Sequence, residues 1–260
     1  MSTLLVDIGN TRAKWAFLKD GRVGRQHAVP HAGRTGRRIA QAILGKNDRK
    51  KPNAVDRVIV VSVAGSQIDN DFASEVRRRL GTGPEFFASS RRAGGVTTLY
   101  SEPWRLGADR FAAAIGAFHL SGGRPVCVVS VGTAMTVDLV DGRGRHRGGA
   151  IVPAPTLMVT SLLKETNGIA RRAQGREGGT KLFARNTHAA ITQGARYAAA
   201  AVADRAIQEA KRVLGRPPLV LLTGGAAPDI RSLLSSEHRH VPDLVLQGLA
   251  VIAAERSSPR

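Results

Sequence analysis

The sequence predicts a duplicated α/β fold. The first observation is a strand–turn–strand pattern in residues 4–18, and the second is its repetition in residues 128–140. Both turns combine glycine with a threonine hydroxyl, and both second strands run into an Asp-Gly turn, at Asp20-Gly21 and Asp141-Gly142. Because each copy opens about half of the chain, we expect two lobes, residues 1–119 and 120–260.

The first copy places a carboxylate, Asp7, at the end of the apolar run Leu4 to Val6. Such a carboxylate is costly unless it has a partner or a function. The Gly9-Asn10-Thr11 turn that follows offers close backbone approach, N–H donors and a hydroxyl, which suits a polyphosphate. It leads into a strand, so it is not the Walker loop, which needs G-x-x-x-x-G-K-[ST] and a helix. A plain hairpin in which Asp7 caps the turn is the alternative.

Two further glycine turns lie at the ends of predicted strands. The strand Val126 to Val131 runs into Gly132-Thr133-Ala134, and a buried strand at residues 219–222 runs into Thr223-Gly224-Gly225-Ala226. Ordinary turns use the same residues, so each is weak alone. Together, the N–H groups and hydroxyls of three such turns predict a nucleotide cleft between the two lobes.

Length and composition indicate a soluble protein of the cytoplasm. The chain has 260 residues and one cysteine, Cys127, which excludes an internal disulfide. Cys127 lies in an apolar strand, where an inert buried thiol is expected. No run approaches the ~20 apolar residues of a membrane span, and the N-terminus has no signal-peptide pattern. We therefore expect cytoplasmic localisation and no membrane partner.

The formal net charge of +19 is unusual. It could indicate a nucleic-acid partner. However, the basic residues are mostly scattered arginines without a nucleic-acid-binding motif, and aromatic residues make up only 4% of the chain. A GC-rich genome would produce the same arginine excess, and phosphate substrates would also be attracted. Nucleic-acid binding is therefore disfavoured.

Hydrophobic periodicity predicts the remaining elements. Helices are expected over residues 36–45, 69–80, 109–120, 156–164, 187–214, 228–234 and 247–256. Further strands are expected over residues 58–63 and 85–88. Residues 46–52, 93–107 and 171–181 are expected to be loops, and such long loops in compact domains are often functional.

These motifs, taken in order, resemble the type III pantothenate kinase family of the acetate kinase/sugar kinase/Hsp70/actin superfamily. The two phosphate motifs, D-x-G-N-[ST]-x-x-K and D-x-G-T-A-x-T-x-D, correspond to residues 7–14 and 130–138. The pantothenate motif, G-V-x-x-x-Y followed by L-G-x-D-R, corresponds to residues 95–100 and 106–110. G-G-x-I-x-P-G corresponds to residues 148–154 and T-G-G to residues 223–225.

The resemblance covers nearly the whole chain and implies both a fold and an activity. The fold is ribonuclease H-like, as in actin-like ATPases, with two lobes around a nucleotide cleft. The activity is ATP-dependent phosphorylation of pantothenate to 4′-phosphopantothenate, the first step of coenzyme A biosynthesis. The family is typically homodimeric, with the pantothenate pocket near the interface, and the long helix from Thr187 is a candidate for that surface.

Site residues follow from the motifs. Asp109, at the start of a helix after a glycine turn, is expected to be the general base for the pantothenate hydroxyl, and a simple N-cap is the alternative. Asp7 is expected to position Mg²⁺ on the ATP phosphates. The expected ATP-binding residues are Asp7, Ile8, Gly9, Asn10, Thr11, Arg12, Ala13, Lys14, Gly132, Thr133, Gly224 and Gly225. The expected substrate-binding residues are Tyr100, Gly107, Ala108, Asp109, Arg110 and Thr187, although Arg110 could instead order its loop or form a salt bridge.

Two positions depart from the family pattern. Ser130 stands where the family usually has an aspartate, and by resemblance that aspartate binds an activating monovalent cation, K⁺ or NH₄⁺. A hydroxyl coordinates K⁺ weakly and supplies no charge, so either the cation dependence or the catalysis is weakened. Ala154 replaces the family glycine after Pro153.

Two alternatives to pantothenate kinase activity stay open. The first is a catalytically weakened or non-catalytic regulatory member of the same family, which Ser130 and the +19 charge support. The second is a kinase for another small alcohol, against which the motif at residues 95–100 argues by family likeness alone.

Overall fold

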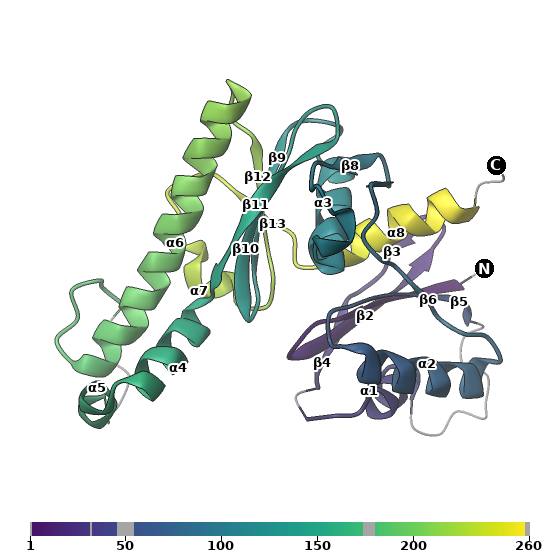
Figure 1. Cartoon of the computed structure of the whole chain (residues 1–260), viewed down its shortest axis with the longest axis horizontal. Helices are drawn as coiled ribbons and strands as arrows, with labels where there is room; N and C mark the ends of the chain where they lie inside the picture. Colours follow the sequence, from purple (N-terminus) through teal and green to yellow (C-terminus); the bar gives the residue numbers. More distant parts are fainter. Residues whose placement is uncertain (1, 32, 46–54, 174–179, 258–260) are drawn as a thin grey trace. The chain divides into compact units, whose positions relative to one another are not determined.

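The computed structural model describes residues 2–31, 33–45, 55–173 and 180–257 (Figure 1). The chain forms two compact units. Unit 1 comprises Met1–Gly123, Arg143–Arg147 and Asp243–Arg260, and unit 2 comprises Arg124–Gly142 and Gly148–Pro242. The division into two lobes, residues 1–119 and 120–260, stays a prediction. The predicted basic loop at residues 46–52 lies outside the described residues.

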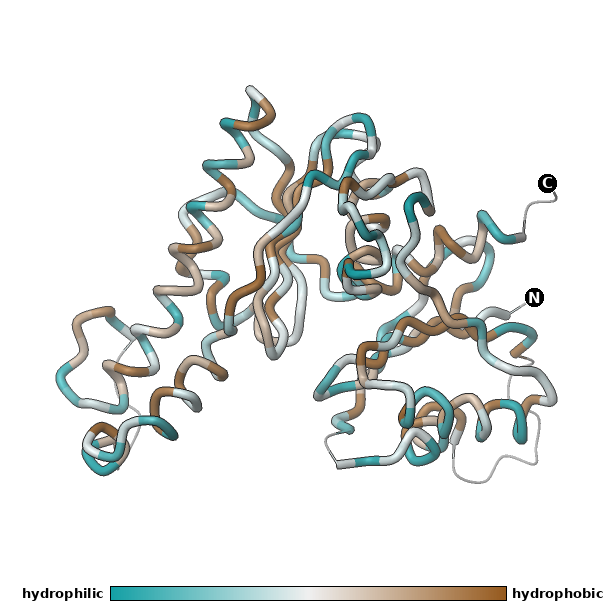
Figure 2. The backbone as a smooth tube through the Cα atoms, in the orientation of Figure 1, coloured by the Kyte–Doolittle hydropathy of each residue, from teal (hydrophilic) through white to brown (hydrophobic). Residues whose placement is uncertain are grey.

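Unit 1 is built around a mixed sheet in the order β3-β2-β1-β5-β6, with β4 also paired to β2. Its strands are β1 (Ser2–Ile8), β2 (Arg12–Lys19), β3 (Arg22–Val23), β4 (His27–Pro30), β5 (Val55–Ser62) and β6 (Glu85–Phe86). The central strand β1 is antiparallel to β2 and parallel to β5. Helices cover both faces of this sheet, so the side chains on both faces of β1 and β5 are buried. These two strands are therefore almost continuously apolar (Figure 2).

Helices cover the two faces of this sheet. On one face, Leu4, Val6 and Ile8 pack with residues of α1 (Gly36–Leu44) and α2 (Ser66–Leu80). Side chains alternate along a strand, so Asp7 points to the opposite face. That face is covered by α3 (Ala108–Leu120) and α8 (Leu244–Ser257). The alternation thereby directs Asp7 toward the helix whose first turn carries Asp109.

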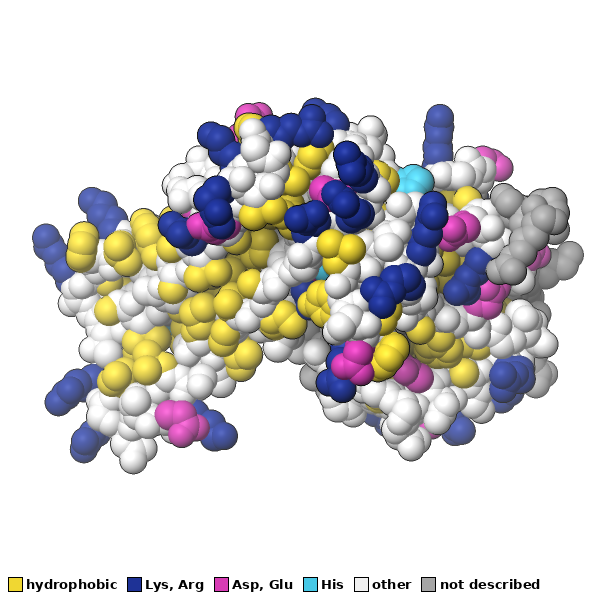
Figure 3. All heavy atoms as spheres, turned by 45° about the horizontal axis from the view of Figure 1, so that its top comes forward, with side chains coloured by type: hydrophobic (Ala, Val, Ile, Leu, Met, Phe, Trp, Pro, Cys, Tyr) yellow, Lys and Arg dark blue, Asp and Glu magenta, His cyan; other side chains and the backbone are white. Residues whose placement is uncertain are grey.

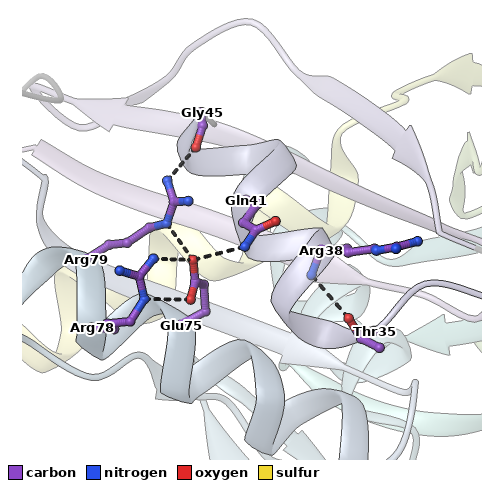
Figure 4. A network of polar contacts seen from close by, with 7 residues as sticks. All are labelled: Thr35, Arg38, Gln41, Gly45, Glu75, Arg78 and Arg79. Carbon is purple, nitrogen blue, oxygen red and sulfur yellow. Dashed lines mark hydrogen bonds and ion pairs between the residues drawn. The ribbon is translucent and has the colours of Figure 1, made fainter. Parts of the chain in front are cut away.

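Glu75 of α2 connects the two helices of the first face (Figure 4). Its carboxylate is only 3% exposed and accepts hydrogen bonds from Arg78, Arg79 and Gln41, the last of these on α1. Arg79 also donates to the carbonyl of Gly45, just after α1. The network satisfies a buried carboxylate while fixing α1 against α2.

The C-terminal helix belongs to unit 1 because glycines let it approach α3 closely. A Cβ at Gly248 would lie 1.8 Å from the carbonyl oxygen of Ala112, and one at Gly116 would lie 2.5 Å from that of Leu244. Any larger residue would force the helices apart. No local sequence signal marks this contact between α8 and α3, which are far apart along the chain.

The connector at residues 93–107 contains structure that the sequence did not predict. It includes the end of β7 (Arg92–Ala93), strand β8 (Val96–Thr98) and a 3₁₀ turn, η1 (Pro103–Arg105). Thr97 and Thr98 of β8 pair with Arg145 and His146 of β11 (Arg145–Pro153). The expectation of a plain loop was wrong because two- and three-residue strands are too short for a periodic pattern.

Unit 2 repeats the strand arrangement of unit 1. Its strands are β9 (Val126–Val131), β10 (Ala134–Val140), β12 (Leu219–Thr223), β13 (Arg239–His240) and the later part of β11, in the order β13-β12-β9-β10-β11. Strand β9 is antiparallel to β10 and parallel to β12, as β1 is to β2 and β5. The predicted duplication is confirmed.

The helices of unit 2 are α4 (Pro155–Glu165), α5 (Asn167–Arg172), α6 (Thr187–Leu214) and α7 (Ala227–Arg231). Helix α6 has the predicted bounds, because Asn186 caps its start and Gly215 ends it in the left-handed region. Ala199, Ala203 and Ile207 of α6 pack with Val129 and Val131 of β9. The predicted loop at residues 171–181 is wrong where α5 ends, and residues 174–179 lie outside the described part.

The structure bears on two expectations, the absence of a membrane span and the scattering of the basic residues. Within the described residues, no helix is long and apolar enough to cross a membrane. Figure 3 shows Lys and Arg side chains spread over the drawn face among uncharged side chains, which agrees with the scattered arginines of the sequence.

Cys127 is buried, and burial, with a contribution from Asp138, raises its pKa to about 12. The expected burial of this thiol is confirmed.

Candidate active site

Asp7 is a buried acid at the end of β1. It is 7% exposed and is the register partner of Lys14 across β1 and β2. Burial raises its pKa to about 6, Lys14 lowers it, and the negative charge of Asp109 raises it. A nearby cation would favour the ionised form of this carboxylate, because opposite charge lowers the pKa of an acid.

The turn after Asp7 is a tight hairpin that presents polar groups to solvent. The N–H of Gly9 donates to the carbonyl of Arg12 at 3.1 Å, and Asn10, Thr11 and Arg12 are exposed. In contrast, the side chains of Ile8 and Ala13 are fully buried. These two predicted ATP-binding residues could therefore meet a nucleotide through the backbone alone, and their side chains form part of the core.

Asp109 occupies the first turn of α3. The N-cap of this helix is Gly107, so the N-cap alternative for Asp109 is wrong. The carboxylate accepts the N–H of Arg110 at 2.8 Å, and a Cβ at position 107 would lie 2.9 Å from its Oδ1. Gly107 thus leaves room for the Asp109 carboxylate at the positive end of the helix, which begins at Ala108.

Arg110 and Tyr100 form the second pair of predicted residues that the structure brings together. Arg110 is 9% exposed, and its Nη1 donates to the Tyr100 hydroxyl at 3.4 Å. The Tyr100 ring lies 5.8 Å from the ring of the buried His146. Arg91 donates to the carbonyls of Thr98, Tyr100 and Ser101 at 2.6–3.1 Å and so fixes the segment that carries Tyr100.

The counterpart of Asp7 in unit 2 is Ser130. On β9 the residues Cys127, Val129 and Val131 pack with α6, so Ser130 points to the opposite face. The following turn is also closed by a backbone hydrogen bond from its first glycine, but a tighter one: the N–H of Gly132 donates to the carbonyl of Ala134 at 2.9 Å, whereas the N–H of Gly9 donates to Arg12. Gly132 and Thr133 are exposed. The duplication therefore extends to a glycine turn between the two strands, although the second turn is shorter than the first.

The third glycine turn is anchored to β9 in the same unit. Gly224 has φ +98°, and a Cβ there would lie 2.2 Å from the carbonyl oxygen of Val131, whereas Gly225 has open space. The N–H of Ala226 donates to that same carbonyl at 2.9 Å. Thr187 is the first residue of α6, directly after the Asn186 cap. These residues share unit 2 with Ser130, Gly132 and Thr133.

A cavity of about 730 Å³ in unit 1 contains none of the predicted site residues. It is lined mainly by α8, together with Thr3, Leu18, His119 and the Gly94-Gly95 turn. Among the described residues, no group of three or more His, Cys, Asp or Glu side chains could hold a metal ion.

Comparison with known proteins identifies the family. The model of the family described as type III pantothenate kinase matches residues 3–209. The chain belongs to the type III pantothenate kinase family. A type III pantothenate kinase of Nitrosococcus oceani is 35% identical over 261 residues, covering 99% of this chain and 96% of the relative. That of Janthinobacterium sp. (strain Marseille) is 39% identical over 259 residues, covering 98% of each.

Solved structures support the actin-like fold of this kinase family. Component A of the (R)-2-hydroxyglutaryl-CoA dehydratase of Acidaminococcus fermentans has a TM-score of 0.56 at 16% identity, covering 98% of this chain and 97% of that one. A ROK family glucokinase of Streptomyces griseus, in complex with glucose and AMPPNP, has a TM-score of 0.51 at 16% identity, covering 99% and 100%. At these identities the likeness shows the fold alone, and the predicted fold class is confirmed.

Several residues of this kinase family member were not predicted although they support the site. Arg91, His146 and His31 each contact a predicted residue or turn through tertiary structure. Arg91 is one of many arginines scattered along the sequence, and neither His31 nor His146 lies in a recognisable motif. No local pattern separates them from ordinary surface or core residues.

Proposed function

We propose that this chain phosphorylates pantothenate to 4′-phosphopantothenate with ATP. The observation that supports this most strongly is the arrangement in unit 1: a buried Asp7 whose pKa is raised to about 6, with Lys14 as its cross-strand partner and Asp109 near enough to affect it. Phosphoryl transfer depends mainly on positioning and on neutralising charge. Family membership adds the substrate, pantothenate.

In this proposal Asp109 accepts the proton of the pantothenate primary hydroxyl as that oxygen bonds to the γ-phosphorus of ATP, while the bond from the γ-phosphorus to the β,γ-bridging oxygen breaks and ADP leaves. Arg110 and Tyr100 hold pantothenate, with Thr187 as a further contact. The turns at Gly9–Thr11, Gly132-Thr133 and Gly224-Gly225 donate N–H and hydroxyl groups to the nucleotide, and Lys14 adds a positive charge. Asp7 would hold Mg²⁺, which, when bound, neutralises charge on the β- and γ-phosphates.

A coupled ATP assay with pantothenate and Mg²⁺ tests the proposal, run with and without K⁺ or NH₄⁺. We expect turnover with the wild type and a loss of at least about 100-fold in kcat for Asp109→Asn, because the general base is removed. Asp229→Asn is a matched control, since Asp229 is an exposed acid in the first turn of α7. It should leave kcat unchanged.

Ser130 favours one alternative, a catalytically weakened or regulatory family member, because it removes the charge of the family aspartate. A folded wild type without turnover under any cation condition would support that alternative. Turnover with other small alcohols but not with pantothenate would support a different substrate. We further propose that the protein is cytoplasmic and that it forms a homodimer. Size-exclusion chromatography with light scattering would test the homodimer.

A further inference from the structure

His31 contacts both sides of the first phosphate turn. It directly follows β4, and only 5% of it is exposed. Its ring Nε2 lies within hydrogen-bond distance of the carbonyl oxygen of Gly9. Its backbone N–H donates to the carbonyl of Thr11 at 3.0 Å. One residue, distant in sequence from the turn, therefore holds two of its carbonyl groups.

These contacts determine where the neighbouring N–H groups point. A trans peptide unit is planar, and its C=O and N–H point in opposite directions. Fixing the Gly9 carbonyl on the His31 ring therefore directs the N–H of Asn10 away from His31. The backbone N–H of His31 fixes the Thr11 carbonyl, and this likewise directs the N–H of Arg12 away from His31. The carbonyl of Arg12 is itself occupied by the N–H of Gly9.

This orientation suits an anion. A carbonyl oxygen turned toward a phosphate would repel it, whereas a backbone N–H attracts it. The second copy of the turn has a related device, since the N–H of Ala154 donates to the carbonyl of Thr133 at 3.4 Å. In both copies the carbonyl of the turn's threonine is thus held by an amide from outside the hairpin.

We propose that His31 is a positioning residue for ATP: it holds the carbonyls of the Gly9–Arg12 turn away from the nucleotide and directs the turn's N–H groups toward the phosphates. The inference rests on the proposed function, which places phosphates at this turn. His31 itself touches neither the substrate nor the reacting atoms. Its contribution therefore falls on the binding of ATP rather than on that of pantothenate.

The test compares two substitutions. His31→Leu removes the Nε2 donor while keeping an apolar side chain in the buried site, and His31→Gln places an amide donor near the position of Nε2. We expect His31→Leu to raise the KM for ATP about tenfold, the effect of one lost hydrogen bond. The KM for pantothenate should stay within about twofold of the wild-type value, and His31→Gln should recover most of the ATP affinity.

His27→Leu is the matched control, because His27 begins β4, the strand that His31 directly follows, but is exposed and stacks on Trp15. It should leave the KM for ATP unchanged. Circular dichroism and thermal unfolding confirm that each variant is folded. If His31→Leu is unfolded at the assay temperature, His31→Asn replaces it, since its shorter side chain keeps a polar group but does not reach Gly9.

The outcomes separate this inference from the proposed function. An active wild type whose KM for ATP is unchanged by His31→Leu would overturn the role of His31 alone, as would equal rises in both KM values. A folded wild type that neither turns over nor binds MgATP by calorimetry would overturn both. A wild type that binds MgATP without turnover still supports the role of His31 if His31→Leu weakens binding about tenfold and His31→Gln restores it.

Discussion

Asp7 and Lys14 face each other across the β1–β2 ladder, on the two sides of the first phosphate turn and one residue pair away from it. Directly opposed residues on antiparallel strands project to the same side. The negative charge of Asp7 and the positive charge of Lys14 therefore meet at the place where a phosphate and its metal ion would bind. Burial nevertheless raises the pKa of Asp7 to about 6, so Lys14 compensates only part of the desolvation cost.

Asp7→Asn is expected to stabilise the ligand-free protein while abolishing activity. The folded pKa of Asp7, about 6, lies above its ordinary value of 3.8, so the native state binds the proton more tightly than the unfolded state. Stability therefore falls as pH rises from about 4 to about 6, by roughly 3 kcal/mol in total. Asparagine carries no such penalty.

Urea unfolding at pH 5 and pH 7.5 measures this effect. The stability advantage of Asp7→Asn should be larger at pH 7.5, whereas the exposed Asp229→Asn should show no comparable pH-dependent gain. An Asp7→Asn variant less stable than the wild type at pH 7.5 would contradict the assigned burial penalty.

Glu75→Gln is expected to destabilise unit 1. Hydrogen bonds from Arg78, and further ones from Arg79 and Gln41, lower the pKa of Glu75 to about 2. A lowered pKa stabilises the fold above pH ~4.5, and that contribution is lost as pH falls toward 2. Because the carboxylate is buried, we expect a loss of about 2 kcal/mol at pH 7.

The control is Glu209→Gln, which removes an acid bonded to Arg205 and Arg212 but 38% exposed. Exposed ion pairs contribute little, so its cost should stay below about 0.5 kcal/mol. Denaturant unfolding at pH 7 and pH 4 provides the comparison. Equal costs for the two variants, or a Glu75→Gln cost that does not shrink at pH 4, would argue against the network in Figure 4.

Gly224→Ala and Gly225→Ala should behave differently although they are neighbours. Gly224 has φ +98°, and a Cβ there would meet the Val131 carbonyl at 2.2 Å, whereas nothing lies within 4 Å of a Cβ at Gly225. We expect Gly224→Ala to cost about 3 kcal/mol of stability and Gly225→Ala very little. Thermal unfolding distinguishes them, and similar melting temperatures would show that the close approach to β9 is not required.

Ser130→Asp should increase activation by K⁺. Ser130 corresponds to Asp7 in the duplication and points away from the α6 face of β9, and an aspartate would restore a charged oxygen ligand there. Turnover is compared at constant ionic strength with KCl or choline chloride. The variant should respond more strongly to K⁺ than the wild type, and an equal response in both proteins would count against a cation site at this position.

Much of this architecture was predictable from local pattern. The repeated strand–turn–strand units, the bounds of α6 and the buried strand β5 follow from apolar periodicity, from glycine at tight turns and from Asn186 as a helix cap. The sequence itself also places Asp7 two residues before Gly9 and Asp109 two residues after Gly107. These features depend on residues within a few positions of one another, so a sequence alone determines them.

Other features were decided by the tertiary structure. The assignment of α8 to unit 1 depends on Gly116 and Gly248 meeting across two distant helices. The electrostatic link of Asp7 to Asp109 depends on which face of the unit 1 sheet α3 and α8 pack against. His31 acts on the first phosphate turn only because β4 pairs with β2. Burial, charge proximity and long-range hydrogen bonds arise from packing, and no local sequence pattern encodes them individually.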